Sequence, residues 1–229
     1  MTKIIQPTYV TTQPSTGKKI QYRPYTIKEE KALLYALQDG SLDAIVAAIK
    51  NTVNACTEGA LDPSIAPYYD AEYVFLQIRS KSVGEVVDLK GGCDEGKPGE
   101  TDFTVDIQDI VIEPKPESHI VIKIPQSNYT VKFRHPTIDE FASIYESGGE
   151  NASDVIASCL VSVYTDDESF DWSTQEKIDF VDSMNPIQQK QIAAWMANMP
   201  KIKLTGSYTC KGCGKLHTKT VSGFQNFFV

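Results

Sequence analysis

The feature that most constrains this chain is an internal repeat with an offset of 111 residues. Shifted by that offset, residues 9–53 share 8 identities with the later segment and need no gap, where unrelated sequences would share about three. The pattern predicts one architectural module that occurs twice; the alternative is a coincidence between two unrelated α+β stretches. The identical pairs are Val10 and Val121, Pro14 and Pro125, Arg23 and Arg134, Thr26 and Thr137, Ile27 and Ile138, Glu29 and Glu140, Asp43 and Asp154, and Ile45 and Ile156.

The first module reads as a hairpin followed by helices. Residues 8–13 and 18–23 are β-rich runs that flank Pro14-Ser15-Thr16-Gly17, a tetrapeptide that favours a tight turn. Thr26 precedes a helical pattern, where its hydroxyl can accept a hydrogen bond from a free backbone amide. The further elements expected are helices at about 27–38, 42–57 and 68–80, then strands at 85–90 and 102–113 around a glycine-rich turn.

The second module restarts this pattern after a proline-rich linker, residues 113–117. The sequence therefore predicts an α+β fold in two units, residues 1–113 and residues 114–229, each ending in a β-turn-β element with a knuckle-like turn. The elements expected in the second unit are strands at 119–124 and 129–134, helices at about 137–147, 152–164, 174–184 and 186–198, and strands at 201–209 and 216–221.

The last turn contains the best local motif, Cys210-Lys211-Gly212-Cys213-Gly214. Two thiols separated by two residues and followed by glycine are typical of a zinc knuckle, and His217 lies close enough to add a nitrogen ligand. The corresponding turn of the first unit contains Cys93, which completes four ligands if the two halves face each other. Two other interpretations stay open: a turn of this shape that has lost its metal and keeps free thiols, and a redox CxxC.

Composition excludes several functional classes. A net charge of −8 argues against a nucleic-acid-binding surface, which needs clustered Lys and Arg. No apolar run approaches the length of a membrane span, and the first residues lack the pattern of a signal peptide. Five cysteines in irregular spacing indicate a reducing cytoplasm. Because no nucleophile, phosphate-loop or HExxH motif is present, we expect no enzymatic activity.

The carboxyl-terminal segment 224–229 carries three phenylalanines among its six residues. Chain ends are usually polar and frayed, so these rings need a cover. They are expected to pack on this chain itself or to insert into a groove of a partner.

Several segments together carry a likeness to a known family. They are Ser15-Thr16-Gly17-Lys18, Arg23-Pro24-Tyr25-Thr26, Lys28-Glu29-Glu30-Lys31-Ala32-Leu33-Leu34, Arg79-Ser80-Lys81-Ser82-Val83-Gly84-Glu85 and Phe227-Phe228. With them, the chain resembles the baseplate hub assembly proteins of T-even-type contractile-tailed bacteriophages. The likeness covers most of the chain and is strongest over residues 8–90.

The resemblance implies a non-enzymatic protein made in the cytoplasm of the infected host. Such a protein would help to assemble the central hub of the tail baseplate, with other tail and hub proteins as partners and with no nucleic acid or membrane. It would act as an assembly factor or chaperone; the alternatives are a permanent component of the baseplate in the virion and a zinc-ribbon adaptor that binds host proteins. The hairpins 8–23 and 119–134 and the segment 224–229 are the expected contact elements. The oligomeric state is left open.

Overall fold

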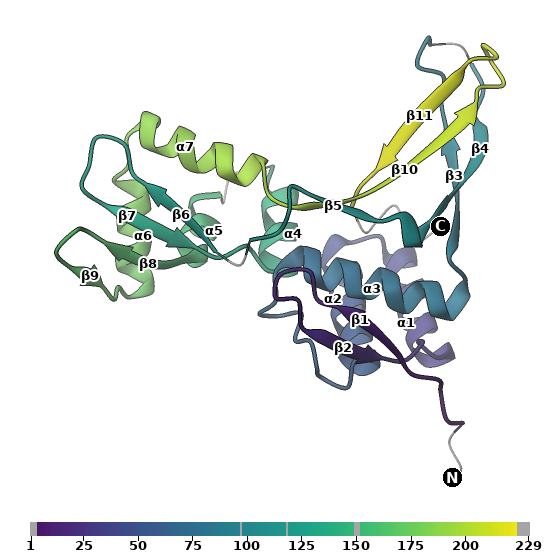
Figure 1. The fold of residues 1–229 in the computed structure, drawn as a ribbon, viewed down its shortest axis with the longest axis horizontal. Coiled ribbons are helices and arrows are strands. Elements are labelled where there is room, and N and C mark those ends of the chain that lie inside the picture. The colour runs from purple at the N-terminus through teal and green to yellow at the C-terminus, as the bar shows by residue number, and fades with distance from the viewer. Residues whose placement is uncertain (1–3, 97, 118, 149–151, 224–229) are drawn as a thin grey trace.

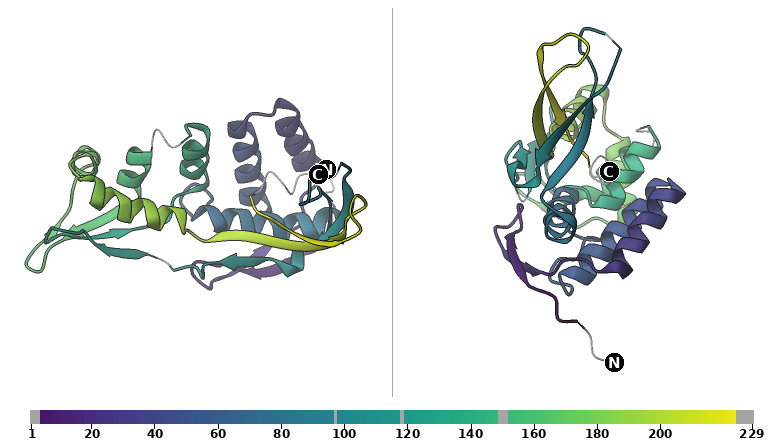
Figure 2. Two further views of the ribbon diagram at one scale, coloured as in Figure 1. Left: turned by 90° about the horizontal axis from the view of Figure 1, so that it is seen from above. Right: turned by 90° about the vertical axis from the view of Figure 1, so that its right-hand side faces the viewer.

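The computed structural model describes residues 4–96, 98–117, 119–148 and 152–223, and it is an α+β fold (Figure 1). Within these residues, small antiparallel sheets alternate with helices along the chain. The molecule is elongated, and Figure 2 (left) shows most helices along one side and the strands along the other. The expectation for segment 224–229 lies outside the described residues.

The first half opens with the predicted hairpin and three helices. Strands β1 (Tyr9–Thr12) and β2 (Lys19–Tyr22) pair antiparallel, and α1 (Ile27–Asp39), α2 (Leu42–Cys56) and α3 (Tyr68–Val83) follow. The alternation of β2 buries Ile20 and Tyr22, while its other residues face solvent. These five elements confirm the prediction within a few residues at each end.

The second part of this half contains a difference from the prediction. The hairpin of β3 (Val86–Gly91) and β4 (Thr101–Asp106) is present, but the expected strand over 102–113 is wrong as a continuous element. The side chain of Asp106 accepts a hydrogen bond from the amide of Gln108 and caps a single 3₁₀ turn, so the backbone leaves the strand there. The chain then continues as β5 (Val111–Glu113).

The second half begins with the second predicted hairpin, β6 (Ile120–Lys123) and β7 (Thr130–Phe133), followed by α4 (Ile138–Glu146). The predicted helix over 152–164 is wrong beyond Cys159. Helix α5 (Ala152–Cys159) ends there, and the chain continues as β8 (Leu160–Tyr164), which pairs with β7 and with the short β9 (Ser169–Phe170). Burial of Leu160 and Val163 against this sheet outweighs the helical pattern of the segment.

The last elements carry the chain back to the first half. Helices α6 (Thr174–Asp182) and α7 (Pro186–Ala197) lead into β10 (Lys201–Thr209), which forms a hairpin with β11 (Leu216–Val221). All four agree with the predicted positions. In Figure 1, β10 runs away from α7 and joins the strands β3 and β4 at the upper right. Its first residues pair with β5.

Two hydrophobic clusters fill the interior. One is formed by residues of β6, β7, β8 and helices α5, α6 and α7, around Val131, Phe133 and Val163. The other contains the helices and hairpins of the first half together with residues of α4, β10 and β11. Trp195 packs against both clusters and so joins them. The division into residues 1–113 and 114–229 stays a prediction, since part of the second unit packs in the core of the first.

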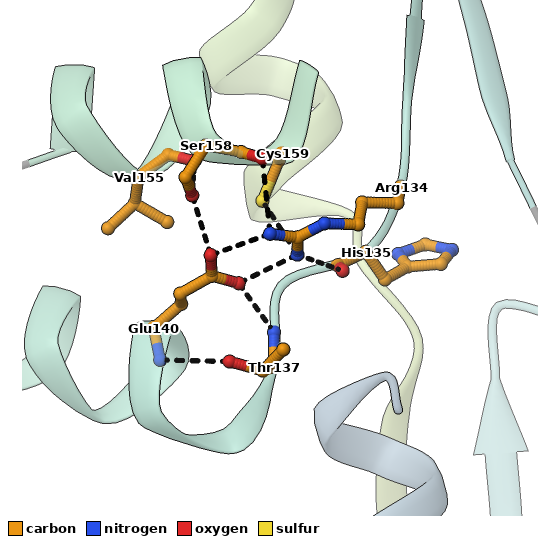
Figure 3. A network of polar contacts seen from close by, with 7 residues as sticks. All are labelled: Arg134, His135, Thr137, Glu140, Val155, Ser158 and Cys159. Atoms are coloured by element: carbon orange, nitrogen blue, oxygen red, sulfur yellow. Dashed lines mark hydrogen bonds and ion pairs between the residues drawn. The ribbon is translucent and has the colours of Figure 1, made fainter. Parts of the chain in front are cut away.

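Each helix that follows a hairpin begins with the same polar arrangement, shown for the second half in Figure 3. The guanidinium of Arg134 donates to both carboxylate oxygens of Glu140, at 2.7 Å each. Glu140 also accepts from the amide of Thr137 and from the hydroxyl of Ser158, and the hydroxyl of Thr137 accepts from the amide of Glu140. The strand end, the helix start and α5 are thereby held together.

The first half has the corresponding arrangement. Arg23 pairs with Glu29 at 3.0 Å, and Glu29 accepts from the amide of Thr26 at 2.8 Å. Thr26 caps α1 as Thr137 caps α4. These residues are among the identities of the 111-residue offset, so the sequence repeat marks the same local structure at both places.

Replacing Glu140 with Gln is expected to reduce stability in a pH-dependent way. Burial alone would raise the pKa of Glu140, but the hydrogen bonds from Arg134 and Ser158 outweigh it and hold the pKa at about 2. The unfolded pKa is about 4.3. The stabilisation is therefore full above that value and is lost as the pH falls toward 2. Allowing for partial exposure, the variant should lose about 1–3 kcal/mol of unfolding free energy at neutral pH.

Urea denaturation between pH 2 and 7 measures this. The difference between wild type and Glu140→Gln should shrink as the pH falls below about 4. Glu146→Gln is the matched control, because it changes the same residue type on the same helix outside the network. A difference that stays constant over this pH range would contradict the prediction.

Candidate metal centre

The two hairpins β3–β4 and β10–β11 lie against each other and form a projecting arm, which is visible at the upper right of Figure 1 and at the top of Figure 2 (right). We call these four strands the arm. Their contact is close because glycine stands at two crossing points. A Cβ atom on Gly206 would lie 2.6 Å from the ring of Phe103, and one on Gly91 would overlap the ring of Tyr208. The ring of Tyr208 also stacks on that of Phe103, with centroids 4.9 Å apart.

Polar contacts between the hairpins set their relative register near the tip. The hydroxyl of Tyr208 donates to the carbonyl of Gly92 at 2.6 Å. The amide of Lys211 donates to the hydroxyl of Thr101 at 2.9 Å. Since one member of each pair comes from each half of the chain, the two end turns are held side by side.

At the tip, the structure brings together the four residues that the sequence analysis singled out. One ligand atom each from Cys93, Cys210, Cys213 and His217 lies within 4.8 Å of every other. Cys210 and His217 are buried, and Cys93 and Cys213 are half-buried. The expected facing of the two turns is therefore correct, and it unites residues that are more than 110 positions apart.

The turn after β10 has the backbone arrangement that presents a thiolate. Gly214 has a φ of 72°, a left-handed value that suits glycine, and its amide donates to the carbonyl of Cys210. The amide of Gly212 lies 3.3 Å from the Cys210 sulfur. Hydrogen bonds from the amides of Cys213 and Gly212 outweigh the effect of burial and lower the pKa of the Cys210 thiol to about 7.

His217 is held between a sulfur and a carboxylate. Its Nε2 lies 3.1 Å from the Cys213 sulfur, and its Nδ1 lies 2.7 Å from a carboxylate oxygen of Asp94. With Nδ1 facing Asp94, Nε2 is the ring nitrogen that faces the cysteines. Sequence reasoning did not select Asp94. Its position directly after Cys93 was the only available signal, and it becomes meaningful once the turns are known to face each other.

The other two cysteines lie apart from this cluster. Cys56 ends α2 and Cys159 ends α5, and both are buried in the hydrophobic clusters, as predicted. Burial is the main cause that raises the pKa of the thiol to about 11 for Cys56 and to about 12 for Cys159. The protein thus has two inert thiols and a separate group of three thiols with one imidazole.

Comparison with known proteins places the chain in a phage context. A family model described as T4 bacteriophage base plate protein matches residues 6–229. The chain is 24% identical over 221 residues to the baseplate hub assembly protein gp26 of Enterobacteria phage T4, a match that covers 93% of both chains. No solved structure matches significantly. In the described part of the chain, no helix is long and apolar enough to cross a membrane.

Two adjacent glycines at the end of β3 differ in the space around them. Substituting each one with alanine should separate the effect of side-chain packing on stability from the effect of backbone conformation. Gly91→Ala is expected to destabilise the protein by about 1–3 kcal/mol, because the added methyl group overlaps the ring of Tyr208. Gly92→Ala is the matched control: its Cβ would meet nothing within 4 Å, so stability should be unchanged or slightly higher. Chemical denaturation of both variants measures the difference, and equal stabilities would contradict the close packing.

Proposed function

The chain belongs to the family of T4 bacteriophage base plate proteins, and on that premise we propose that it acts in the assembly of the central hub of the tail baseplate. It binds hub subunits as a non-enzymatic assembly factor. The observation that carries this proposal is the match, along nearly all of both chains, to a relative named as a baseplate hub assembly protein. The place of action is the cytoplasm of the infected host.

The exposed edges of the hairpins supply a physical mode of binding. In the described residues, β1 pairs only with β2, and β6 is an outer strand of the sheet β6-β7-β8-β9. An unpaired strand edge offers a row of amides and carbonyls that a strand of another protein can extend. An assembly factor that uses such edges binds a subunit through its backbone and leaves when the proper neighbour arrives.

The two edges resemble each other in their apolar side chains. Val10 on β1 is 61% exposed, and Val121 on β6, its equivalent at the 111-residue offset, is 58% exposed. Behind them, the equivalent inward residues Ile20 and Val131 are both fully buried. We infer that the fold is a tandem pseudo-repeat and that each copy presents one docking edge. This agreement of burial at equivalent positions is what supports the inference.

A lysine on each edge is expected to abolish binding without unfolding the chain. The double variant Val10→Lys, Val121→Lys places a charge on both exposed edges, which disfavours strand pairing. Both forms are co-expressed with the hub proteins of the same phage and recovered by affinity capture. The wild type should retain hub subunits, and the double variant should retain at least tenfold less of them. The melting temperature should stay within a few degrees of the wild type.

Ile187→Lys is the matched control, because Ile187 is 57% exposed but lies on helix α7. It should capture hub subunits as the wild type does. Full capture by the double variant would overturn the role of the edges. Retention of no tail protein by the wild type would overturn the proposed function.

Mass spectrometry of purified particles adds a further check: a stoichiometric copy number would contradict a transient factor and favour a permanent component of the virion.

A further inference from the structure

We propose that Cys93, Cys210, Cys213 and His217 bind one Zn²⁺ ion, which joins the two halves of the chain at the tip of the arm. The proposal does not depend on the function proposed above. Three thiols and one imidazole form a donor set that is typical of structural zinc sites. In the described residues these four groups come from two hairpins. Cys93 lies on one hairpin, and the other three lie on the second.

The distances suit a tetrahedral ion. Zn–S bonds of about 2.3 Å and Zn–N bonds of about 2.0 Å separate tetrahedral ligand atoms by roughly 3.5–3.8 Å. All four ligand atoms lie within 4.8 Å of one another, so small side-chain rotations bring them to bonding distance. Since four protein ligands fill the coordination sphere, the site is closed and its role is structural.

The residues around the ligands provide the expected outer contacts. Asp94 accepts a hydrogen bond from Nδ1 of His217 and thereby directs Nε2 toward the ion, as carboxylates do for zinc-bound histidines. The amide of Gly212 points at the Cys210 sulfur, a contact that stabilises a metal thiolate. A redox CxxC normally opens a helix, whereas this motif links β10 to β11 and has two further donors beside it. The oriented histidine distinguishes the cluster from a turn that merely keeps free thiols.

The ion would act as a cross-link between the hairpins. Because the ligands come from both halves, binding couples the fold of the arm to the metal, and removal of the ion should loosen the contact of β4 with β10. We expect a local effect, since none of the four ligands lies on a helix.

Metal analysis of the full chain, purified under reducing conditions from zinc-supplemented medium, should find about one zinc per chain. Exchange with Co²⁺ should give the intense visible absorption of a tetrahedral ion together with a thiolate-to-cobalt charge-transfer band. Cys93→Ser should weaken this band, and Cys56→Ala should leave it unchanged, because Cys56 lies outside the cluster. Absence of bound zinc, an octahedral Co²⁺ spectrum, or an unchanged band in Cys93→Ser would overturn the proposal.

A second pair of variants keeps the test valid if a ligand variant fails to fold. Asp94→Asn preserves all four ligands but weakens the orientation of His217, and it should lower zinc affinity 10–100-fold in competition with a chromophoric chelator. Glu95→Gln is the matched control from the same turn: Glu95 pairs with Lys215 and is not a member of the cluster, so affinity should be unchanged. Equal affinities for both variants would contradict the role of Asp94 as the carboxylate that orients His217 toward the ion.

Discussion

The close contact of the hairpins β3–β4 and β10–β11 is the constraint on which the rest of the structure depends. It requires a residue without a side chain at Gly206, where the strand crosses Phe103 and Val105, and another at Gly91 beneath Tyr208. Because β10 leaves the second half to make this contact, residues of β10, β11 and α4 share a hydrophobic cluster with the helices and hairpins of the first half. The same contact places the end turns side by side and so creates the candidate metal centre.

A second set of interactions is local and connects the elements within each half. The arginine after the hairpin, Arg23 or Arg134, pairs with the glutamate of the helix cap, Glu29 or Glu140. The backbone amide of each arginine also donates to a carbonyl at the end of the second helix, Cys56 or Cys159, at 2.9 Å. These contacts connect each hairpin to the two helices that follow it, at equivalent places in both halves.

What the sequence could predict follows from the range of the interactions involved. Hairpins and capped helices depend on neighbours a few residues apart, so β10, β11 and the starts of α1 and α4 were readable from turns, caps and periodicity. The strand β8 was not, because its helical pattern is overridden by pairing with β7, a long-range contact. Cys93 was found through the repeat, which carried long-range information. Asp94 was missed because its partner, His217, lies 123 residues away.

The arrangement also keeps the packing of the helices apart from the strand edges proposed for binding. Most helices lie along one side of the molecule and the strands along the other, as Figure 2 (left) shows. Val10 on β1 and Val121 on β6 are exposed. Strand edges bind well only when the strand is held rigid, because ordering a loose segment costs about 1–2 kcal/mol per residue. The arginine–glutamate pairs hold the end of each hairpin against the start of the helix that follows it. If both edges bind as proposed above, one subunit is recognised at two places, and the second contact then forms within an existing complex, which strengthens binding.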